Sequence, residues 1–383
     1  MVNRMVLNEI SYFGPNARAV LKDEYETRGY RKALVVSDQN LLDLGITQKV
    51  LSVLDAGTIA YEVFSDLKPN PTVKSVKAGV QKYHEVGADS IIAVGGGSSI
   101  DVAKAIGIIV TNPEFGDVVS LAGVANTKNK SVPIIALPTT AGTAAEVTIN
   151  YVITDEDTDT KMVCVDPHDI PVLAIIDTEL MAGMPAAIAA STGMDALTHA
   201  IEGYITKASW CMTDMMHLKA IQMIFENLAK AVNEKDTEAI TNMGIAQYIA
   251  GMGFSNVGLG IVHSMAHQLG AIYDTPHGVA NAVLLPYVMK YNGLVCVEKY
   301  AEIGRSIGLS MDGLSEDEII HAVVGEVRNL ARTVGIPEHL SEIGVNEVDI
   351  PLLSKKAIED PCTGGNPRET SVDEIAAIYR EAM

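Results

Sequence analysis

The chain is poor in basic residues. Its 383 residues include 28 Lys and Arg against 48 Asp and Glu, which gives a formal net charge of −20 at pH 7. Proteins that bind nucleic acid need a basic face to displace counterions from the phosphates, and polybasic segments attract proteins to anionic membrane surfaces. The charge balance therefore argues against a nucleic-acid partner and against a membrane partner.

Long apolar runs and paired cysteines are missing as well. No uninterrupted apolar stretch approaches the roughly 20 residues of a membrane span, and Asn8 and Glu9 interrupt the N-terminal apolar residues well short of a signal-peptide core. The cysteines are far apart and form no CxxC pair, which argues against a disulfide framework and against a cysteine-rich zinc site. They are Cys164, Cys211, Cys296 and Cys362. We therefore expect a cytoplasmic protein.

Hydrophobic periodicity divides the chain into two parts. Up to about residue 184, short β-branched runs alternate with helical stretches, which is typical of a parallel α/β sheet buried on both faces. The clearest runs are residues 32–37, 90–94, 132–137 and 172–176. Beyond Pro185 long helical patterns dominate, at residues 186–205, 213–231, 237–251 and 316–334. Because the chain is too long for one compact core, we predict an α/β domain over residues 1–184 and a helical domain over residues 185–383.

A glycine-rich turn follows the second of these runs. Gly95, Gly96, Gly97 and Ser98 come directly after residues 90–94, and a helical pattern begins there. Glycines let the backbone approach a pyrophosphate closely, and a helix N-terminus offers unpaired N–H groups. The GxGxxG fingerprint of the common dinucleotide-binding turn is absent. A nucleotide site is one interpretation, and a tight turn without a ligand is the alternative.

Two other strand ends favour the nucleotide interpretation. Thr139 and Thr140 follow the run 132–137, and their hydroxyl groups suit phosphate and ribose oxygens. Asp38 ends the run 32–37, where an acid can accept both ribose hydroxyls and would repel a 2′-phosphate, favouring NAD over NADP. Because Asp38 precedes the glycines in the chain, the sheet topology must differ from the standard arrangement.

Histidines and one aspartate recur at helical spacing in the second part. Asp195 and His199 lie four residues apart on the pattern 192–205, and His263 and His267 repeat this spacing on a predicted helix over 257–269. His277 follows at a Pro–His–Gly corner. A carboxylate with several imidazoles suits Fe(II) or Zn(II). Five candidates exceed a four-coordinate site, so we expect one of them to lie behind the ligands or to transfer a proton.

Other hypotheses remain open on these residues alone. A single histidine packs in a core more often than it binds metal, and Glu202, on the same helix face as Asp195, is interpreted as structural. A metallopeptidase would need a general-base glutamate where Ser264 stands. A sugar-phosphate lyase of the dehydroquinate synthase type would need cations near the metal, whereas residues 251–282 contain no Lys or Arg. That segment favours a small neutral alcohol or aldehyde, and a binding protein without catalysis is the last alternative.

Longer motifs resemble one family along the whole chain. GGGS, PTTAGTAAEVT, GMDALTHAIEGY, GLGIVHSMAHQLGA and TPHGVANAVLLP occur here in the order seen in the iron-containing (group III) alcohol dehydrogenases. VTINYVITDE, KMVCVDPHDIP and CTGGNPRE resemble those members that interconvert lactaldehyde and 1,2-propanediol. The resemblance implies a Rossmann-like dinucleotide-binding domain over residues 1–184 and a metal- and substrate-binding helical domain over 185–383. It also implies NAD and Fe(II) as cofactors, with Zn(II) as an alternative metal.

The resemblance further implies roles for individual residues. By motif position the metal ligands are Asp195, His199, His263 and His277, with His277 and His267 as catalytic residues and His267 as a proton relay. The implied cofactor contacts are Asp38, Asn70, Gly96, Gly97, Ser98, Thr139, Thr140, Asn150, Lys161 and Leu180. A homodimer paired through residues 5–10 is also implied. The first substrate pair is lactaldehyde and 1,2-propanediol, with ethanol, methanol and 1,3-propanediol as alternatives.

Overall fold

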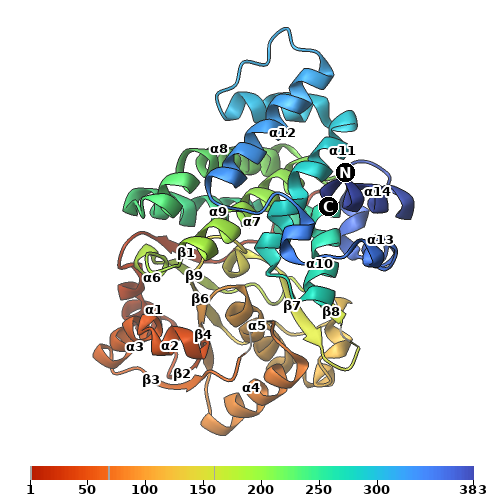
Figure 1. The fold of residues 1–383 in the computed structure, drawn as a ribbon. Helices are drawn as coiled ribbons and strands as arrows, with labels where there is room; N and C mark the ends of the chain where they lie inside the picture. The colour runs from red at the N-terminus through yellow and green to blue at the C-terminus, as the bar shows by residue number, and fades with distance from the viewer. Residues whose placement is uncertain (1, 68–69, 159) are drawn as a thin grey trace. The chain divides into compact units, whose positions relative to one another are not determined.

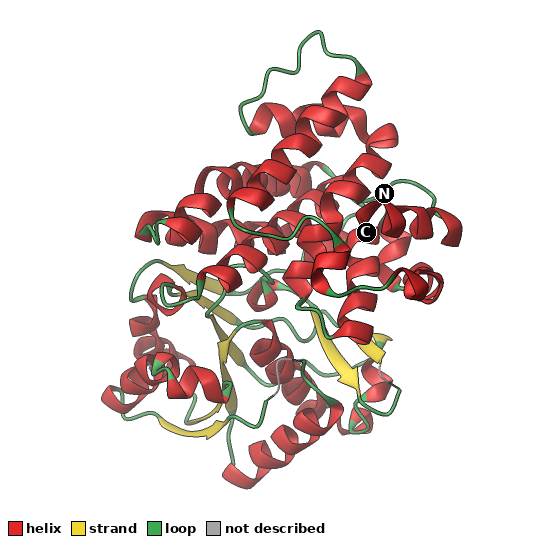
Figure 2. Cartoon of the chain, in the orientation of Figure 1, coloured by secondary structure: helices red, strands yellow, loops and turns green. Residues whose placement is uncertain are grey.

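The computed structural model describes residues 2–67, 70–158 and 160–383. It divides into two compact units, of which the first comprises Met1–Thr140 and Ala144–Gly183 and the second Ala141–Thr143 and Met184–Met383. Within the described ranges every strand belongs to the first unit, and the second unit is built of helices (Figure 2).

A six-stranded parallel sheet organises the first unit. Its order is β1-β9-β6-β4-β2-β3, and all neighbouring strands run parallel (Figure 1). The strands are β1 (Ile10–Phe13), β2 (Lys32–Val36), β3 (Ala60–Phe64), β4 (Ser90–Gly95), β6 (Ile134–Pro138) and β9 (Leu173–Ile176). The four predicted runs are the adjacent central strands β9, β6, β4 and β2, whose residues are almost all buried. The predicted parallel α/β sheet is therefore confirmed.

Helices cover both faces of this sheet. Because successive side chains of a strand point to opposite faces, Val35 and Ile92 pack in one core while Leu34 and Ile91 pack in another. The helices that contribute to the two cores are α1 (Leu21–Arg28) and α3 (Ile46–Ala56) on one side, and α4 (Val73–Val86) and α5 (Gly97–Thr111) on the other. Burial on both faces explains why these strands read as continuous apolar runs.

A small second sheet in the first unit is not predicted from the sequence. β7 (Asn150–Asp155) pairs antiparallel with β8 (Thr160–Val165), and the short β5 (Gly123–Val124) pairs parallel with β8. The burial of β7 and β8 alternates along each strand. They therefore lack the continuous apolar run that identifies the central strands.

The second unit consists of helices that pack around long apolar faces. Its α-helices are α7 (Ala186–Ile205), α8 (Cys211–Asn233), α9 (Thr237–Val257), α10 (Ile261–Tyr273), α11 (His277–Ser306), α12 (Glu316–Thr333), α13 (Ile350–Glu359) and α14 (Val372–Ala382). The four long predicted helices correspond to α7, α8, α9 and α12. The helical character of this part of the chain is therefore confirmed.

α9 and α10 meet at a sharp, glycine-containing break. Gly258 has a φ of 82°, a backbone conformation that favours glycine, and it ends α9. The predicted helix over 257–269 is therefore wrong at its start, because α10 begins only at Ile261. No single helix of the described residues is long and apolar enough to cross a bilayer; α9 and α10 meet such criteria only as a pair, bent by 100° at this break.

A buried histidine lies where three helices of the second unit approach closely. A Cβ on Gly203 of α7 would lie 2.4 Å from Nε2 of His217 in α8, and one on Gly253 of α9 would lie 2.2 Å from it. Both ring nitrogens of His217 are buried without a hydrogen-bond partner among the described residues. Burial lowers the pKa of His217 to about 3, so the folded chain holds a neutral imidazole.

We expect the free energy of unfolding to fall as the pH drops from about 6.5 towards 3. In this range the unfolded chain protonates His217, whose ordinary pKa is 6.5, while the folded chain does not. This group alone contributes a slope of up to about 1.4 kcal/mol per pH unit, which falls to about half of that near pH 6.5 and vanishes at more alkaline pH. Urea unfolding at pH 7, 6, 5 and 4 should therefore show a steeper acid dependence for the wild type than for His217→Leu. Equal slopes for the two proteins would disprove the effect.

Candidate functional site

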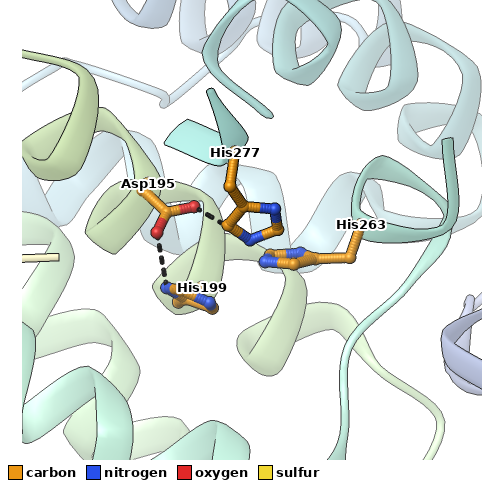
Figure 3. A group of neighbouring side chains, drawn as sticks. All are labelled: Asp195, His199, His263 and His277. Carbon is orange, nitrogen blue, oxygen red and sulfur yellow. Dashed lines mark ion pairs between the residues drawn. The ribbon is translucent and has the colours of Figure 1, made fainter. Parts of the chain in front are cut away.

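Three helices of the second unit bring four predicted metal ligands together. Asp195 and His199 lie one turn apart on α7, His263 lies in the first turn of α10, and His277 is the first residue of α11. One ligand atom from each residue lies within 4.8 Å of the others. Figure 3 shows the four side chains pointing toward one another. The i, i+4 spacing on α7 places Asp195 and His199 on one face, as the sequence predicts.

Burial holds the imidazoles in the form that binds metal. The exposed fractions of Asp195, His199 and His263 are 1%, 5% and 2%. Burial lowers the pKa of His199, and it lowers the pKa of His263 well below the ordinary value. Neutral imidazole and ionised carboxylate are the protonation states that ligate divalent metals. The His277 side chain is 33% exposed, so it is the most exposed of the four predicted ligands.

The side-chain amide of Asn281 gives a test of whether these residues fit a cation. Its Nδ2 lies 2.7 Å from Asp195 Oδ1, 3.1 Å from His277 Nε2 and 3.2 Å from His263 Nε2. Three acceptors thus converge on a nitrogen that carries only two hydrogens. His199 Nδ1, buried without a hydrogen-bond partner in the described part of the chain, faces Asp195 Oδ2 at 3.9 Å. This convergence of lone pairs fits a divalent ion such as Fe(II) or Zn(II).

Glu202 orients one of these imidazoles. Its Oε2 lies 2.6 Å from Nδ1 of His263, and its Oε1 accepts the backbone N–H of Val262 at 2.7 Å. Burial raises the pKa of Glu202 to about 8, against the lowering effect of the backbone hydrogen bonds. The bond to Nδ1 leaves Nε2 of His263 as the nitrogen that faces the other ligands. The sequence analysis interprets Glu202 as a structural residue. Its hydrogen-bond partner is a predicted metal ligand, so Glu202 also bears on the candidate site.

We expect Glu202→Gln to weaken metal binding by about 10- to 100-fold, because residues that hold a ligating histidine contribute effects of this size. The substitution keeps the side-chain volume but replaces one of the two carboxyl oxygens by an amide nitrogen, so the contacts to the N–H of Val262 and to Nδ1 of His263 can no longer both be made to an oxygen. Metal content after dialysis against graded chelator concentrations measures the change. Thr198→Val is the matched control, since Thr198 is a buried residue of α7 whose hydroxyl donates only to Met194 O among the contacts described. Equal metal retention in the two variants would show that Glu202 does not support metal binding.

His267 lies beside the ligand cluster and forms a pair with Asp360. Its ring centroid is 5.5 Å from that of His277 and 6.1 Å from that of His263. Nδ1 of His267 lies 2.8 Å from Asp360 Oδ2, and Oδ1 of Asp360 accepts the N–H of Cys362 at 2.9 Å. Although burial favours the neutral acid, the hydrogen bond with His267 lowers the pKa of Asp360 below its ordinary value. An ionised Asp360 therefore accepts a hydrogen bond from the N–H at Nδ1, which leaves Nε2 of His267 as the nitrogen that can exchange a proton.

Sequence reasoning missed Asn281, Asp360 and Phe254. The ring of Phe254 stacks on His199 at 4.2 Å between centroids. Asn281 could have been found, because it follows His277 by one helical turn. Asp360 lies 93 residues after His267, and no spacing rule connects residues so far apart.

Several predicted cofactor contacts lie at one edge of the large sheet. Asp38 follows β2, Gly96 caps α5 after β4, Thr139 and Thr140 follow β6, and Leu180 lies in α6 (Thr178–Met181) after β9. These strands are adjacent and parallel, so their carboxyl ends share an edge, where open α/β sheets bind ligands. A Cβ on Gly96 would lie 3.3 Å from Oγ1 of Thr140, so the turns after β4 and β6 approach closely. Gly97 and Ser98 lie in the first turn of α5, and the N-terminal turn of a helix is suited to binding an anion.

The remaining predicted contacts lie around the small sheet. Lys161 of β8 donates from Nζ to Oδ1 of Asn70 at 3.1 Å. Asn150 is the first residue of β7, and its Oδ1 is buried without a hydrogen-bond partner within the described ranges. An unsatisfied buried carbonyl oxygen is costly. It is therefore an independent reason to expect a ligand group at Asn150.

Comparison with known proteins identifies the family. The profile of iron-containing alcohol dehydrogenases matches residues 8–178, and the profile of the C-terminal domain of Fe-containing alcohol dehydrogenases matches residues 189–383. The chain belongs to the iron-containing alcohol dehydrogenases. This alcohol dehydrogenase is 54% identical to lactaldehyde reductase of Escherichia coli (strain K12) over 382 residues, which cover 100% of both chains.

Other relatives agree with this placement. The dehydrogenase is 42% identical to 1,3-propanediol dehydrogenase of Klebsiella pneumoniae, over 98% of this chain and 97% of the relative. Among solved structures, 1,3-propanediol oxidoreductase superimposes with a TM-score of 0.97 at 41% identity, covering 100% of both chains. Alcohol dehydrogenase from Oenococcus oeni gives a TM-score of 0.97 at 37% identity, again over 100% of both. The resemblance stated from the motifs is confirmed, and the protein is an NAD-dependent alcohol dehydrogenase of a metal-containing family.

Proposed function

We propose that this enzyme interconverts lactaldehyde and 1,2-propanediol with NAD(H) and Fe(II). The observation that carries the proposal is the convergence of Asp195, His199, His263 and His277 on one point of a chain whose full length is similar to lactaldehyde reductase. In this proposal residues 1–184 bind the dinucleotide, and residues 185–383 bind the metal and the substrate.

Asp195, His199, His263 and His277 would hold the metal. Bound there, a divalent ion supplies a Lewis acid that polarises the substrate oxygen. The ligating residues are rigid because they project from helices and because Glu202 fixes the ring of His263. Rigid donors keep their geometry during the reaction, which is the main contribution of such a site.

His267 would exchange the proton that balances hydride transfer. When an aldehyde is reduced, the carbonyl carbon takes a hydride from NADH and the oxygen takes a proton. Asp360 holds Nδ1 of His267, so Nε2 is free to give that proton and to recover one from solvent. The His267 side chain is only 8% exposed, which limits proton exchange to a defined path.

The carboxyl end of the large sheet would bind NAD(H). Gly96, Gly97 and Ser98 would approach the pyrophosphate with Thr139 and Thr140 beside them, and Asp38 would accept the ribose hydroxyls. Asn70, Asn150 and Lys161 would complete the site from the small sheet, and Leu180 would contribute apolar surface.

We expect Asp38→Asn to shift coenzyme preference toward NADPH by about tenfold in kcat/KM, equivalent to about 1.4 kcal/mol. Oδ1 of Asp38 accepts the N–H of Leu41 at the start of α2 (Gln39–Asp43), and asparagine retains that acceptor. The change therefore keeps the start of α2 and removes the charge that repels a 2′-phosphate, together with one of the two oxygens that would accept the ribose hydroxyls. The ratio of kcat/KM with NADPH to that with NADH measures the shift, and Asp43→Asn on the same short helix serves as control. An unchanged ratio would exclude Asp38 from the ribose site.

The residues around the metal centre favour a small neutral substrate. From 251 to 282 the chain carries no Lys or Arg, and Asp274 is its only acid. A phosphorylated or carboxylate substrate would need a cation in this region. This supports a dehydrogenase of short alcohols over a sugar-phosphate lyase.

Absorbance at 340 nm tests the proposal directly. Enzyme loaded with Fe(II) without oxygen should oxidise NADH with lactaldehyde, at a higher kcat/KM than with acetaldehyde, formaldehyde or 3-hydroxypropanal. A higher value with one of the other aldehydes would replace the proposed substrate. If NADH is not consumed with any of these aldehydes, the dehydrogenase assignment itself is rejected.

We also propose that the enzyme acts as a homodimer in the cytoplasm. All four cysteines are free thiols, which suits a reducing compartment. β1 is an edge strand, and its Ile10 and Phe13 are 40% and 43% exposed, so pairing with a second copy near residues 5–10 would cover them. Sedimentation equilibrium should give twice the mass of the chain, and a monomer would contradict the dimer.

A further inference from the structure

Part of the outer edge of strand β7 is bonded to side chains of helix α5 rather than to backbone. β7 lies at the edge of the small sheet and pairs only with β8 among the described strands. On its other edge the backbone groups of alternate residues need partners, because every second N–H and C=O of an antiparallel strand points away from its neighbour. Helix α5 supplies the partners of two of these groups, the carbonyl of Asn150 and the N–H of Val152.

Lys104 of α5 satisfies the first part of this edge. Its Nζ donates to the carbonyl oxygens of Thr148 at 2.7 Å and Asn150 at 2.9 Å, and to Oγ1 of Thr148 at 3.0 Å. These three acceptors match the three N–H groups of an ammonium. Lys104 is fully buried, with 0% exposure, so it cannot itself contact a coenzyme at the surface.

Asp101 continues the same edge one helical turn earlier. Its Oδ2 accepts the backbone N–H of Val152 at 3.1 Å. Burial raises the pKa of Asp101 to about 7 and lowers that of Lys104, and the opposite charge of each residue counteracts the shift in the other. Asp169 and Glu146, from outside α5, also place negative charge near Lys104. A second ionisable side chain of α5 is thus hydrogen-bonded to the backbone of β7.

The edge ends at the segment that carries Asn70. The N–H of Thr154 donates to the carbonyl of Pro71 at 2.7 Å, and Thr154 forms a parallel bridge with Thr72. In the β7–β8 register Thr154 is paired with Lys161, whose Nζ reaches Asn70. Strand β7 therefore connects Asp101 and Lys104 of α5 with Asn150 and, through Thr154, with the segment of Asn70 and with Lys161 of β8.

We propose that Lys104 and Asp101 are positioning residues for coenzyme binding, which set the place of Asn150 and of the Asn70–Lys161 pair relative to the pyrophosphate turn at the start of α5. Gly97 and Ser98 lie on the same rigid helix, within two turns of both side chains. The inference rests on the proposed NAD(H) site. It adds two residues that touch no coenzyme and act through the backbone of β7.

A purely structural role is the competing explanation. A buried lysine that loses its partners or is replaced would lower stability in either case. If the role is positioning, a substitution of Lys104 also lowers the affinity for NADH, and it does so more than a substitution elsewhere on α5 that lowers the stability by the same amount. The test must therefore compare variants of similar stability.

Lys104→Met is the first variant, because it keeps the length of the side chain and removes its donors. Ile106→Ala is the matched control, since Ile106 lies on α5 and packs in the core between α5 and the large sheet. NADH fluorescence titration of the full metal-loaded enzyme gives Kd, and hydrogen exchange of the peptide covering residues 148–155 reports the strand edge. We expect Lys104→Met to raise Kd by about tenfold or more and to speed exchange in that peptide. Metal content should be unchanged, and Ile106→Ala should leave Kd within about twofold of the wild type.

The outcomes separate this inference from the proposed function. If the wild-type enzyme fails to bind NADH, the proposed coenzyme site is wrong. If the wild type binds NADH and Lys104→Met binds it equally well, the positioning role is overturned while the coenzyme site stands. If Lys104→Met does not fold, Asp101→Ala carries the same measurement: it should raise Kd and speed exchange at Val152, and an unchanged Kd overturns the proposal.

Discussion

Asp195→Asn should lose its bound metal and lower kcat with lactaldehyde by about a thousandfold or more. Asp195 is the only carboxylate among the four converging groups, and Asn281 Nδ2 already lies 2.7 Å from its Oδ1. Replacing the anion with a neutral amide removes the charge that balances a divalent ion among three neutral imidazoles. Loss of the Lewis acid costs several kcal/mol in the transition state, which corresponds to a rate loss of about this size.

Metal analysis and NADH oxidation on the same preparation measure this effect. Asp274→Asn is the control, because Asp274 is an exposed residue that ends α10 with a φ of 52°, a conformation that asparagine tolerates. It should keep both metal and activity. An Asp195→Asn enzyme with a full complement of metal and wild-type kcat would show that the four residues do not form the site.

His267→Gln should lower kcat by about a hundredfold or more, and Asp360→Asn should produce a loss of similar kind. A positioned acid–base group contributes about 10²- to 10⁴-fold, and Asp360 fixes which nitrogen of His267 carries the proton. Because the two residues act as one unit, the double variant should be little worse than His267→Gln alone. Metal content should stay at the wild-type level in all three variants.

Two isotope effects identify the step that has been damaged. With His267→Gln the solvent deuterium effect on kcat should rise, because proton transfer becomes slower, while the effect of deuterated NADH should shrink. Gln268→Ala, on the same helix, is the control and should change neither. Strictly additive losses in the double variant would contradict the coupling of His267 with Asp360.

The sequence predicts the buried part of the fold more reliably than its edges. The central strands can be predicted because burial on both faces makes their residues continuously apolar; they are β2, β4, β6 and β9. β1 and β3 lie at the edges of the large sheet, and β7 and β8 alternate between buried and partly exposed positions, so none of them has this pattern. The start of α10 was misplaced because Gly258 interrupts a composition that is otherwise helical on both sides.

For the site, local spacing reveals ligands but not the residues that hold them. Asp195 with His199 and His263 with His267 are recognisable because each pair lies one helical turn apart. The partners Glu202 and Asp360 are joined to His263 and His267 by tertiary contacts across 61 and 93 residues. No periodicity encodes such contacts. The bonds from Lys104 to Thr148 and Asn150 could not be predicted either, because they depend on how α5 packs on β7.

X-ray absorption at the iron edge, on enzyme reconstituted with Fe(II) without oxygen, tests the central claim most directly. Our account predicts one iron per chain, bound by three imidazole nitrogens and at least one carboxylate oxygen and by no sulfur, with NADH oxidation rising in proportion to iron content. A spectrum with fewer imidazole ligands or with a thiolate, or full turnover by iron-free protein, would contradict it.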